Sequence, residues 1–277
     1  MAVKLIADPH GRFQDLHACV GADDVLVVLG DVLDLIDWAD ISGILPDVLG
    51  RDNLIEKLMQ ALAAGPGAAV ELRDELLAPQ GGYYGELLRR ISEQYADFAR
   101  VLREIGCAAY VIYGNGDIPE LLEACLDGAS NAVLARGKVD IEGSVFGFVP
   151  GALYSPFHMP AEMDDETFGS CLRDLGPVDV LCTHIPPRLE AATMDVVAGR
   201  PVEGSAYLLK YVEANRPRFL YHGHVHQPAQ RELLVGSTRV INVAYYKREG
   251  YVHTHGVSPG HGTFSVPSHG VRPEKGT

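Results

Sequence analysis

The sequence predicts a layered α/β fold in which the β-sheets are covered on both faces. Short, continuously apolar runs rich in β-branched residues recur along the 277-residue chain, and such runs are typical of strands with both faces buried. Several runs end abruptly in polar residues, and in α/β folds functional groups collect just past the carboxyl ends of strands. The composition, with 47% hydrophobic and 22% charged residues, is that of a globular protein and excludes global disorder.

The expected strands fall into two groups. Runs that end in Asp, His or Asn lie at 3–7, 25–30, 109–114, 178–183 and 219–223. Shorter strands separated by glycine-containing turns are expected at 138–142, 144–150, 231–235 and 238–244. The second half of the chain is therefore expected to be rich in β-structure.

A helical insertion is expected at about 38–105. Its best helix is 86–105, where apolar residues recur at spacings of three and four, and shorter helices are expected near 53–63 and 70–77. The insertion could cap a cleft, shape specificity or mediate homo-oligomerisation, and the residues do not choose among these roles. We expect one domain over 1–257, followed by a disordered tail at 258–277 that is rich in Gly, Pro and Ser.

The charge and cysteine content exclude several classes of protein. A net charge of −14 makes extended binding to nucleic acid unfavourable, because that binding needs a basic surface. No apolar run reaches the ~18–20 residues of a membrane span, and residues 1–10 read as a strand opening, not as a signal peptide. The five cysteines are scattered without a CxxC pair, so we expect reduced thiols and a cytoplasmic location.

Polar residues with metal-ligating side chains follow the strands of the first group. Taken singly they are weak signals: Asp8-x-His10 occurs by chance, Asp31 could cap a turn, and His224 and His226 could be a hydrogen-bonded core pair. Together they form an ordered set, namely Asp8, His10, Asp31, Asn115, His184, His224 and His226.

In this order and with these residue types, the chain resembles the calcineurin-like metallophosphoesterase superfamily, whose pattern is DxH, GDxxD, GN(H)D, a lone His and GHxH. The resemblance covers roughly residues 3–245. It implies a four-layer α/β/β/α sandwich of two mixed β-sheets flanked by helices, with two metal ions at the strand ends. It also implies that Asp31 bridges the metals, with Asp8, His10 and His226 on one and Asn115, His184 and His224 on the other.

The residue types suit a site for two divalent cations. Two dications ~3.5–4 Å apart repel one another, and a carboxylate can bridge them. Because most of these side chains are neutral, the loaded site would keep a net positive charge and attract a small phosphorylated substrate. The set contains no thiolate, so it suits manganese, iron, zinc, cobalt or nickel, and the residues do not choose among them. Manganese is the metal we expect.

The resemblance also implies a mechanism, in which a metal-bridging hydroxide attacks phosphorus. The third block reads Gly114-Asn115-Gly116-Asp117, so the family's usual proton-donating His is absent. We therefore expect a phosphodiesterase, because a monoester of a poor leaving group depends most on a general acid. The alternatives are a phosphomonoesterase, a nucleotide or lipid pyrophosphatase, and a non-enzymatic scaffold with this fold. The complete ligand set favours an enzyme over a scaffold.

Further residues are assigned to the site. Asp31, Asn115 and Asp117 are expected to be catalytic, with Asp117 orienting a histidine ligand and Asp34 holding its own loop. Arg12, Gly116 and Arg188 are expected at the substrate, although Arg12 could be an exposed loop arginine. Tyr154 and His158 are weaker candidates for substrate contact. The histidines expected on the surface are His17, His253, His255, His261 and His269.

Overall fold

The computed structural model describes residues 1–38 and 40–258, and its first sheet has five strands. Their order is β15 (His253–Thr254), β1 (Val3–Ile6), β2 (Val25–Leu29), β3 (Ala108–Ile112) and β4 (Ala132–Leu134). The strands from β1 to β4 are parallel, and β15 is antiparallel to β1. Every residue of β2 is buried, as its uninterrupted apolar run predicts.

The second sheet has six strands. Their order is β13 (Glu232–Val235), β14 (Thr238–Asn242), β12 (Phe219–His222), β9 (Val180–Thr183), β6 (Ser144–Val149) and β5 (Gly137–Ile141). The four central strands are parallel, and β13 and β5 form antiparallel edges. The second half of the chain is thus rich in β-structure, as predicted.

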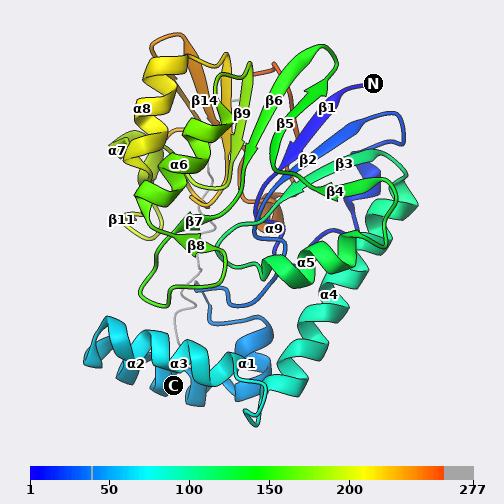
Figure 1. Ribbon diagram of the computed structural model, residues 1–277. Coiled ribbons are helices and arrows are strands. Elements are labelled where there is room, and N and C mark those ends of the chain that lie inside the picture. The colour runs from blue at the N-terminus through cyan, green and yellow to red at the C-terminus, as the bar shows by residue number, and fades with distance from the viewer. Residues whose placement is uncertain (39, 259–277) are drawn as a thin grey trace, which may run out of the picture.

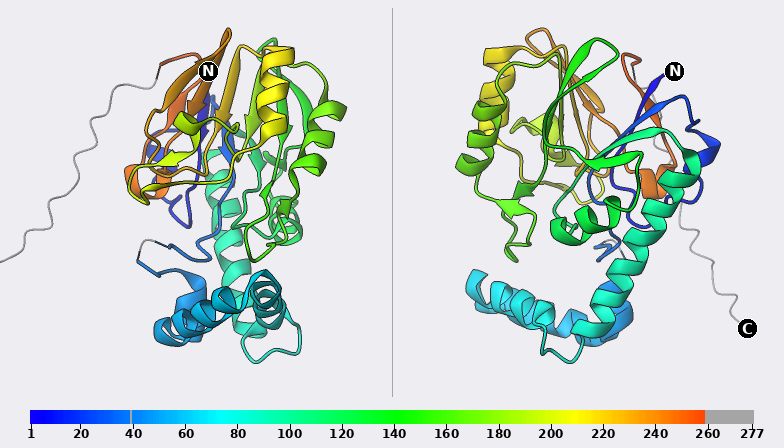
Figure 2. Two further views of the ribbon diagram at one scale, coloured as in Figure 1. Left: turned by 90° about the vertical axis from the view of Figure 1, so that its left-hand side faces the viewer. Right: turned by 45° about the vertical axis from the view of Figure 1, so that its right-hand side comes forward.

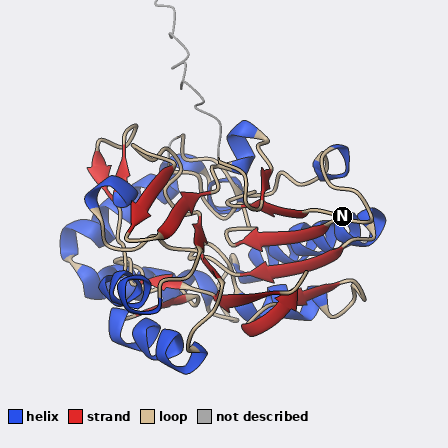
Figure 3. Ribbon diagram, turned by 90° about the horizontal axis from the view of Figure 1, so that it is seen from above, coloured by secondary structure: helices blue, strands red, loops and turns tan. Residues whose placement is uncertain are grey.

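The two sheets pack face to face between two layers of helices (Figures 1 and 3). Buried side chains that include Phe146, Phe148 and Tyr221 fill the space between the sheets. The first sheet is covered by α4 (Tyr84–Ile105) and α5 (Pro119–Leu126), and the second by α6 (Asp165–Leu175) and α8 (Ala206–Asn215). The predicted four-layer sandwich of two mixed sheets is confirmed.

The helical insertion has two structurally different parts. Helices α1 (Ile44–Leu49), α2 (Arg51–Ala64) and α3 (Pro66–Leu77), which we call the arm, project beyond the sandwich (Figure 2). Helix α4 lies on the first sheet and buries Phe98 and Leu102 in the same core as Phe13 and Val111, a core that buried arm residues such as Leu54 and Leu72 extend. Helix α4 is therefore an outer layer of the sandwich, whereas α1, α2 and α3 project from it.

Short elements complete the described chain. They are the 3₁₀ turn Leu16–Ala18, β7 (Ala152–Leu153), β8 (Glu162–Met163), α7 (Glu190–Thr193), β10 (Met194–Asp195), β11 (Arg200–Pro201) and α9 (Tyr246–Glu249). In the described part of the chain, no helix combines the length and apolarity that crossing a membrane requires. The tail expected at 258–277 lies outside the described residues after Ser258.

One expectation for the surface histidines is wrong. His253 has no exposed surface, because β15 pairs with β1 and places this side chain against Tyr221 of the second sheet. His255 is partly buried and contacts the Tyr221 hydroxyl at 2.9 Å. The sequence gives no sign of this, because a two-residue edge strand is too short to show a periodicity.

Candidate metal centre

The carboxyl ends of strands from both sheets meet at one place. The backbone N–H of Asp8 donates to Gly30 O, and that of Gly223 donates to His184 O. The N–H of His224 donates to Asp8 Oδ2 at 3.0 Å, which ties the second sheet to the first. We call the seven predicted ligands that gather here the candidate metal centre.

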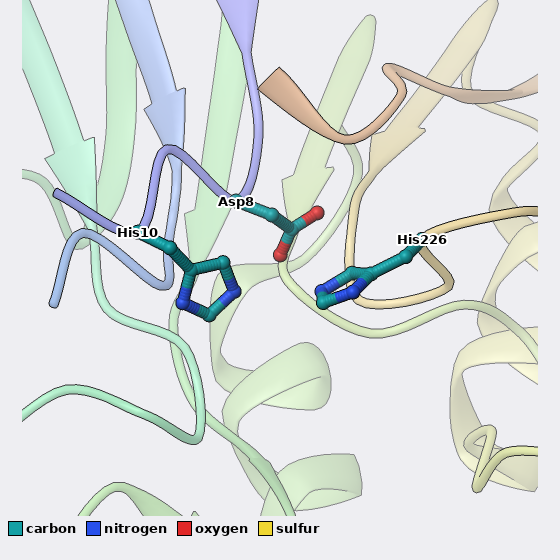
Figure 4. A group of neighbouring side chains, drawn as sticks. All are labelled: Asp8, His10 and His226. Carbon is teal, nitrogen blue, oxygen red and sulfur yellow. The ribbon is translucent and has the colours of Figure 1, made fainter. Parts of the chain in front are cut away.

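Each predicted ligand lies against at least one other. The ligand atoms of Asp8, His10 and His226 lie within 4.8 Å of one another, and so do those of Asp8, Asp31 and His184. Figure 4 shows Asp8, His10 and His226 directed into a common space. Asn115 Oδ1 is 3.1 Å from His184 Nε2, and the His224 ring is centred 5.0 Å from that of His184.

Asp31 lies between two of the predicted histidine ligands. Its Oδ2 lies 3.6 Å from His10 Nε2 and also 3.6 Å from His184 Nε2. Asp8 belongs to both groups of ligand atoms, whereas Asp31 belongs to one, but Asp8 approaches His184 on the Nδ1 side, at 3.9 Å. Because that nitrogen already faces a carbonyl, Asp31 is the better candidate to contact two cations.

Hydrogen bonds fix which imidazole nitrogen can bind a cation. His10 Nδ1 is 3.0 Å from Leu33 O, and His184 Nδ1 is 2.8 Å from Leu29 O. A carbonyl oxygen only accepts, so each Nδ1 carries the proton and each Nε2 presents a lone pair to the centre. His10 Nε2 is buried without a hydrogen-bond partner. Such an orphaned acceptor facing a carboxylate fits a site built for a metal ion.

The charges of the side-chain cluster are unbalanced. Burial lowers the pKa of His224 to about 3 and that of His226 to about 4, so both are neutral at pH 7. Burial, together with the nearby Asp31 carboxylate, raises the pKa of Asp8 well above its usual range. Within the described chain neither carboxylate forms an ion pair with Lys or Arg. Divalent cations would supply the positive charge that these two buried carboxylates lack. The Asp, His and Asn donors suit transition metals.

The backbone at the centre is strained. Asp8, His10, Asp31 and His224 have φ of 53°, 39°, 52° and 66°, in the left-handed region that side chains rarely adopt. Residues held in such conformations cluster at functional sites, because the surrounding structure must impose them. Four of the seven predicted ligands therefore have an unfavourable backbone conformation that the surrounding structure imposes.

Two glycines allow the loops to approach closely. A Cβ at Gly114 would lie 2.5 Å from His184 Cε1, and one at Gly223 would lie 2.6 Å from Asp8 Oδ2. Both contacts are far shorter than van der Waals distance. The glycines of the third and fifth blocks are thus required by crowding around the ligands.

Asp117 organises the loops without touching a histidine ligand in any contact that the structure shows. Its carboxylate accepts from the backbone N–H groups of Leu33 and Gly114, both at 3.0 Å, and from the Tyr95 hydroxyl, also at 3.0 Å. Burial and the Asp31 carboxylate raise its pKa to about 6. Asp117 therefore joins the loop after Asp31 to the loop before Asn115, which corrects the expectation that it orients a histidine.

Sequence reasoning missed two tyrosines at the centre. Tyr95 reaches Asp117 from α4, and its hydroxyl also accepts from the Ile118 N–H at 2.8 Å. The Tyr245 ring stacks on His226, with centroids 3.8 Å apart. Tyr95 has the spacing of a core residue and no motif includes Tyr245, so no sequence signal distinguishes either.

The expected substrate residues are placed as follows. Arg12 binds the Asp15 carboxylate at 2.6 Å and the Lys247 carbonyl at 3.1 Å, so its charge is already paired. Arg188 donates to Gly204 O at 3.0 Å and keeps a half-exposed side chain. The Gly116 N–H donates to Asp31 Oδ1 at 2.7 Å, directly inside the centre. Contact of these residues with a substrate stays a prediction.

Comparison with known proteins supports the fold. One solved structure covers 90% of this chain and 92% of its own length, with a TM-score of 0.59 and 19% identity. The protein TT1561 of Thermus thermophilus covers 91% and 96%, with a TM-score of 0.52 and 13% identity. A Staphylococcus aureus protein provisionally described as a 5′-nucleotidase is matched over 88% of this chain and 48% of its own length, with a TM-score of 0.44 and 14% identity. No family model and no curated protein matches the sequence.

Proposed function

We propose that the protein is a dimetal-dependent phosphoesterase that favours phosphodiesters. The observation that carries the proposal is the position of Asp31 Oδ2, 3.6 Å from the Nε2 atoms of both His10 and His184. One carboxylate oxygen shared by two imidazoles whose lone pairs face it is the arrangement that two neighbouring cations need. The fold shared with solved structures is compatible with this proposal.

The residues divide into two sets around Asp31. Asp8, His10 and His226 would hold one cation, and Asn115, His184 and His224 the other. When bound, such a pair of ions supplies charge stabilisation at the phosphoryl oxygens and lowers the pKa of water. The protein's own part is to fix these side chains before a substrate arrives: Leu29 and Leu33 carbonyls orient the imidazoles, and the Gly116 N–H orients Asp31.

The preference for diesters rests on Gly116. This residue follows Asn115 and touches Asp31, yet it has no side chain that could protonate a leaving group. Loss of a positioned general acid costs about 10²–10⁴ in rate, and an alkoxide leaving from a monoester would suffer most. The homo-oligomeric state and the cytoplasmic location stay predictions.

The test is reconstitution followed by paired assays. Metal-free protein is loaded with manganese, iron, zinc, cobalt or nickel, and hydrolysis of methyl phenyl phosphate is compared with that of phenyl phosphate and of inorganic pyrophosphate. We expect two metal ions per chain and fastest hydrolysis of the diester. His10→Ala should abolish activity, whereas His17→Gln, a matched change of an exposed histidine, should not. Faster cleavage of the monoester or of pyrophosphate would contradict the diester preference, and no hydrolysis at full occupancy would favour a scaffold.

A further inference from the structure

Four aromatic side chains gather on two loops beside the arm. Trp38 and Phe157 stack with centroids 6.2 Å apart at 24°, and Tyr154 and His158 stack at 4.0 Å and 13°. Trp38 is 56% exposed and Tyr154 is 44% exposed. We call Trp38, Tyr154, Phe157 and His158 the aromatic platform. A contiguous group of exposed aromatic rings, unlike a single exposed ring, is typical of a binding surface.

Both loops begin beside the candidate metal centre. Trp38 follows Asp37, whose carboxylate accepts from the Tyr245 hydroxyl at 3.0 Å, and the Tyr245 ring stacks on His226. The second loop begins at Gly151, whose N–H donates at 2.9 Å to the carbonyl of Tyr113, two residues before Asn115. The Trp38–Phe157 stack therefore joins a loop beside His226 to a loop beside Asn115. Figure 1 shows the β7–β8 loop on the side of the sandwich that faces the arm.

The loop of the platform is held rigidly from beneath. The largely buried Glu162 carboxylate accepts from the Ser155 N–H at 2.8 Å, the Ser155 hydroxyl at 2.9 Å and the Met159 N–H at 3.0 Å. A buried acid with three donors fixes the loop on which Phe157 and His158 stand. His158 itself has a left-handed φ of 46°. These contacts hold the exposed rings in a fixed position before any ligand binds. Strained backbone that the surrounding structure imposes in this way is found most often at functional sites.

The arm contributes a second support. Arg73 of α3 donates to the carbonyl oxygen of Phe157 at 3.2 Å and also to that of His158. The Arg73 side chain is 20% exposed, and its contact with Phe157 is partly buried, whereas that with His158 lies at the surface. The arm thus fixes the platform at a set position.

We propose that the aromatic platform binds a flat ring carried by the substrate, stacked on the exposed indole of Trp38, while the phosphoryl group lies at the candidate metal centre. This proposal rests on the proposed function and specifies its substrate class as phosphoesters that carry an aromatic group. A planar, polarisable ring binds an exposed indole more tightly by stacking than a saturated ring of the same size does. The phosphate supplies affinity at the metals, and the platform supplies selectivity.

Trp38 is the one tryptophan of the sequence, so its fluorescence reports on the platform directly. Metal-loaded protein is titrated with phenylphosphonate and with cyclohexylphosphonate, which have the same anionic group and cannot be hydrolysed as esters. We expect phenylphosphonate to change the Trp38 emission saturably and to bind about tenfold more tightly than cyclohexylphosphonate. Inorganic phosphate should displace phenylphosphonate, because both need the metals.

Variants followed by calorimetry complete the test. Trp38→Ala should remove the tenfold preference for the phenyl ring, and Trp38→Phe should keep most of it. Tyr83→Ala is the matched control, because Tyr83 is an exposed aromatic residue that precedes α4, outside the platform. Equal binding of the two phosphonates, a preference that survives Trp38→Ala, or emission changes that phosphate does not reverse would each overturn the proposal.

The two proposals fail separately in this design. Hydrolysis of methyl phenyl phosphate without any ring preference would leave the proposed function in place and overturn the platform. Phosphate-reversible quenching by phenylphosphonate, in a loaded protein that hydrolyses no ester, would support the platform and overturn the phosphoesterase.

Discussion

The candidate metal centre and the arm differ in how the chain holds them. Asp8, Asp31 and His184 are all nearly inaccessible to solvent, and backbone hydrogen bonds between strands of both sheets fix the loops around them. The arm packs α2 against α3, its buried side chains continue the core that covers the first sheet, and it carries exposed ion pairs such as Lys57–Glu75. If both proposals hold, the sandwich as a whole determines the chemistry, and the arm, which holds the aromatic platform through Arg73, contributes to selectivity. Substitutions in the two regions should accordingly differ in what they change and by how much.

The largest effect is expected at Asp31. Asp31→Asn keeps the shape of the side chain, and Asn tolerates the left-handed backbone at this position. The loss of the shared negative charge should reduce metal content from two ions per chain to fewer than one, and hydrolysis by at least about a thousandfold. Elemental analysis and steady-state kinetics measure both. Glu75→Gln on the arm is the matched change, and it should alter neither quantity; retention of both metals by Asp31→Asn would contradict the bridging role.

The next effect concerns Gly116. Its φ is not left-handed, so a side chain is compatible with the backbone, although a Cβ would lie 3.3 Å from Asp31 Oδ1. Gly116→His should raise hydrolysis of phenyl phosphate relative to methyl phenyl phosphate, by up to the ~10²–10⁴ of a positioned general acid. The ratio is measured at equal metal occupancy. A wild-type protein that already prefers the monoester would show that another residue supplies the proton.

A substitution at Tyr95 tests whether α4 stabilises the candidate metal centre. Tyr95→Phe removes a hydroxyl that donates to the buried Asp117 and accepts from the Ile118 N–H. We expect a loss of about 1–3 kcal/mol in the free energy of unfolding, measured by urea denaturation, together with weaker metal binding. No change in stability would mean that water replaces the hydroxyl and that α4 is less closely coupled to the site.

The effect of pH on stability should also differ between the sandwich and the arm, because residues 44–77 of the arm contain no histidine. Burial, together with the neighbouring His255 and Arg239, lowers the pKa of His253 to about 4, while Glu232 opposes the shift. Since the unfolded chain takes up the proton first, this histidine makes the protein less stable as pH falls from about 6.5 toward 4. Between pH 7 and pH 5 we expect its share of the loss to be about 2 kcal/mol.

Urea denaturation of the wild type and of His253→Phe at both pH values measures that share. The variant should lose less stability on acidification than the wild type. His17→Gln, at an exposed position, should show the wild-type response. Identical pH dependence in all three proteins would contradict the assignment to His253.

The smallest effect is expected on the arm. The Lys57–Glu75 pair spans 3.1 Å, but Glu75 is 60% exposed, and ion pairs of this kind contribute below about 1 kcal/mol. Lys57→Ala should therefore change the free energy of unfolding by less than that and leave the metal content at the wild-type value. A drop in metal content would show that the arm supports the centre directly.

The sequence predicted the fold and the grouping of ligands because both follow from strand ends. Apolar runs identify the strands, and parallel strands bring their carboxyl ends to one edge, where Asp8, Asp31 and His184 then meet. The divided insertion could not be predicted, because the apolar stripe of α4 has the same spacing whether it packs on a sheet or on other helices. Tyr95 illustrates this ambiguity: it lies on that stripe, and only the tertiary structure shows that its hydroxyl reaches Asp117.

The pairing of β15 with β1 has a consequence for how the protein is made. Lys4 lies opposite Thr254, and the side chains that converge at the centre range from Asp8 to His226 along the chain. A nascent chain therefore cannot complete the cluster until His226 has left the ribosome, since contacts between distant segments form late. The edge of β1 stays uncovered until His253 and Thr254 have been synthesised, and during this interval the strand that leads into Asp8 is open to pairing with other chains.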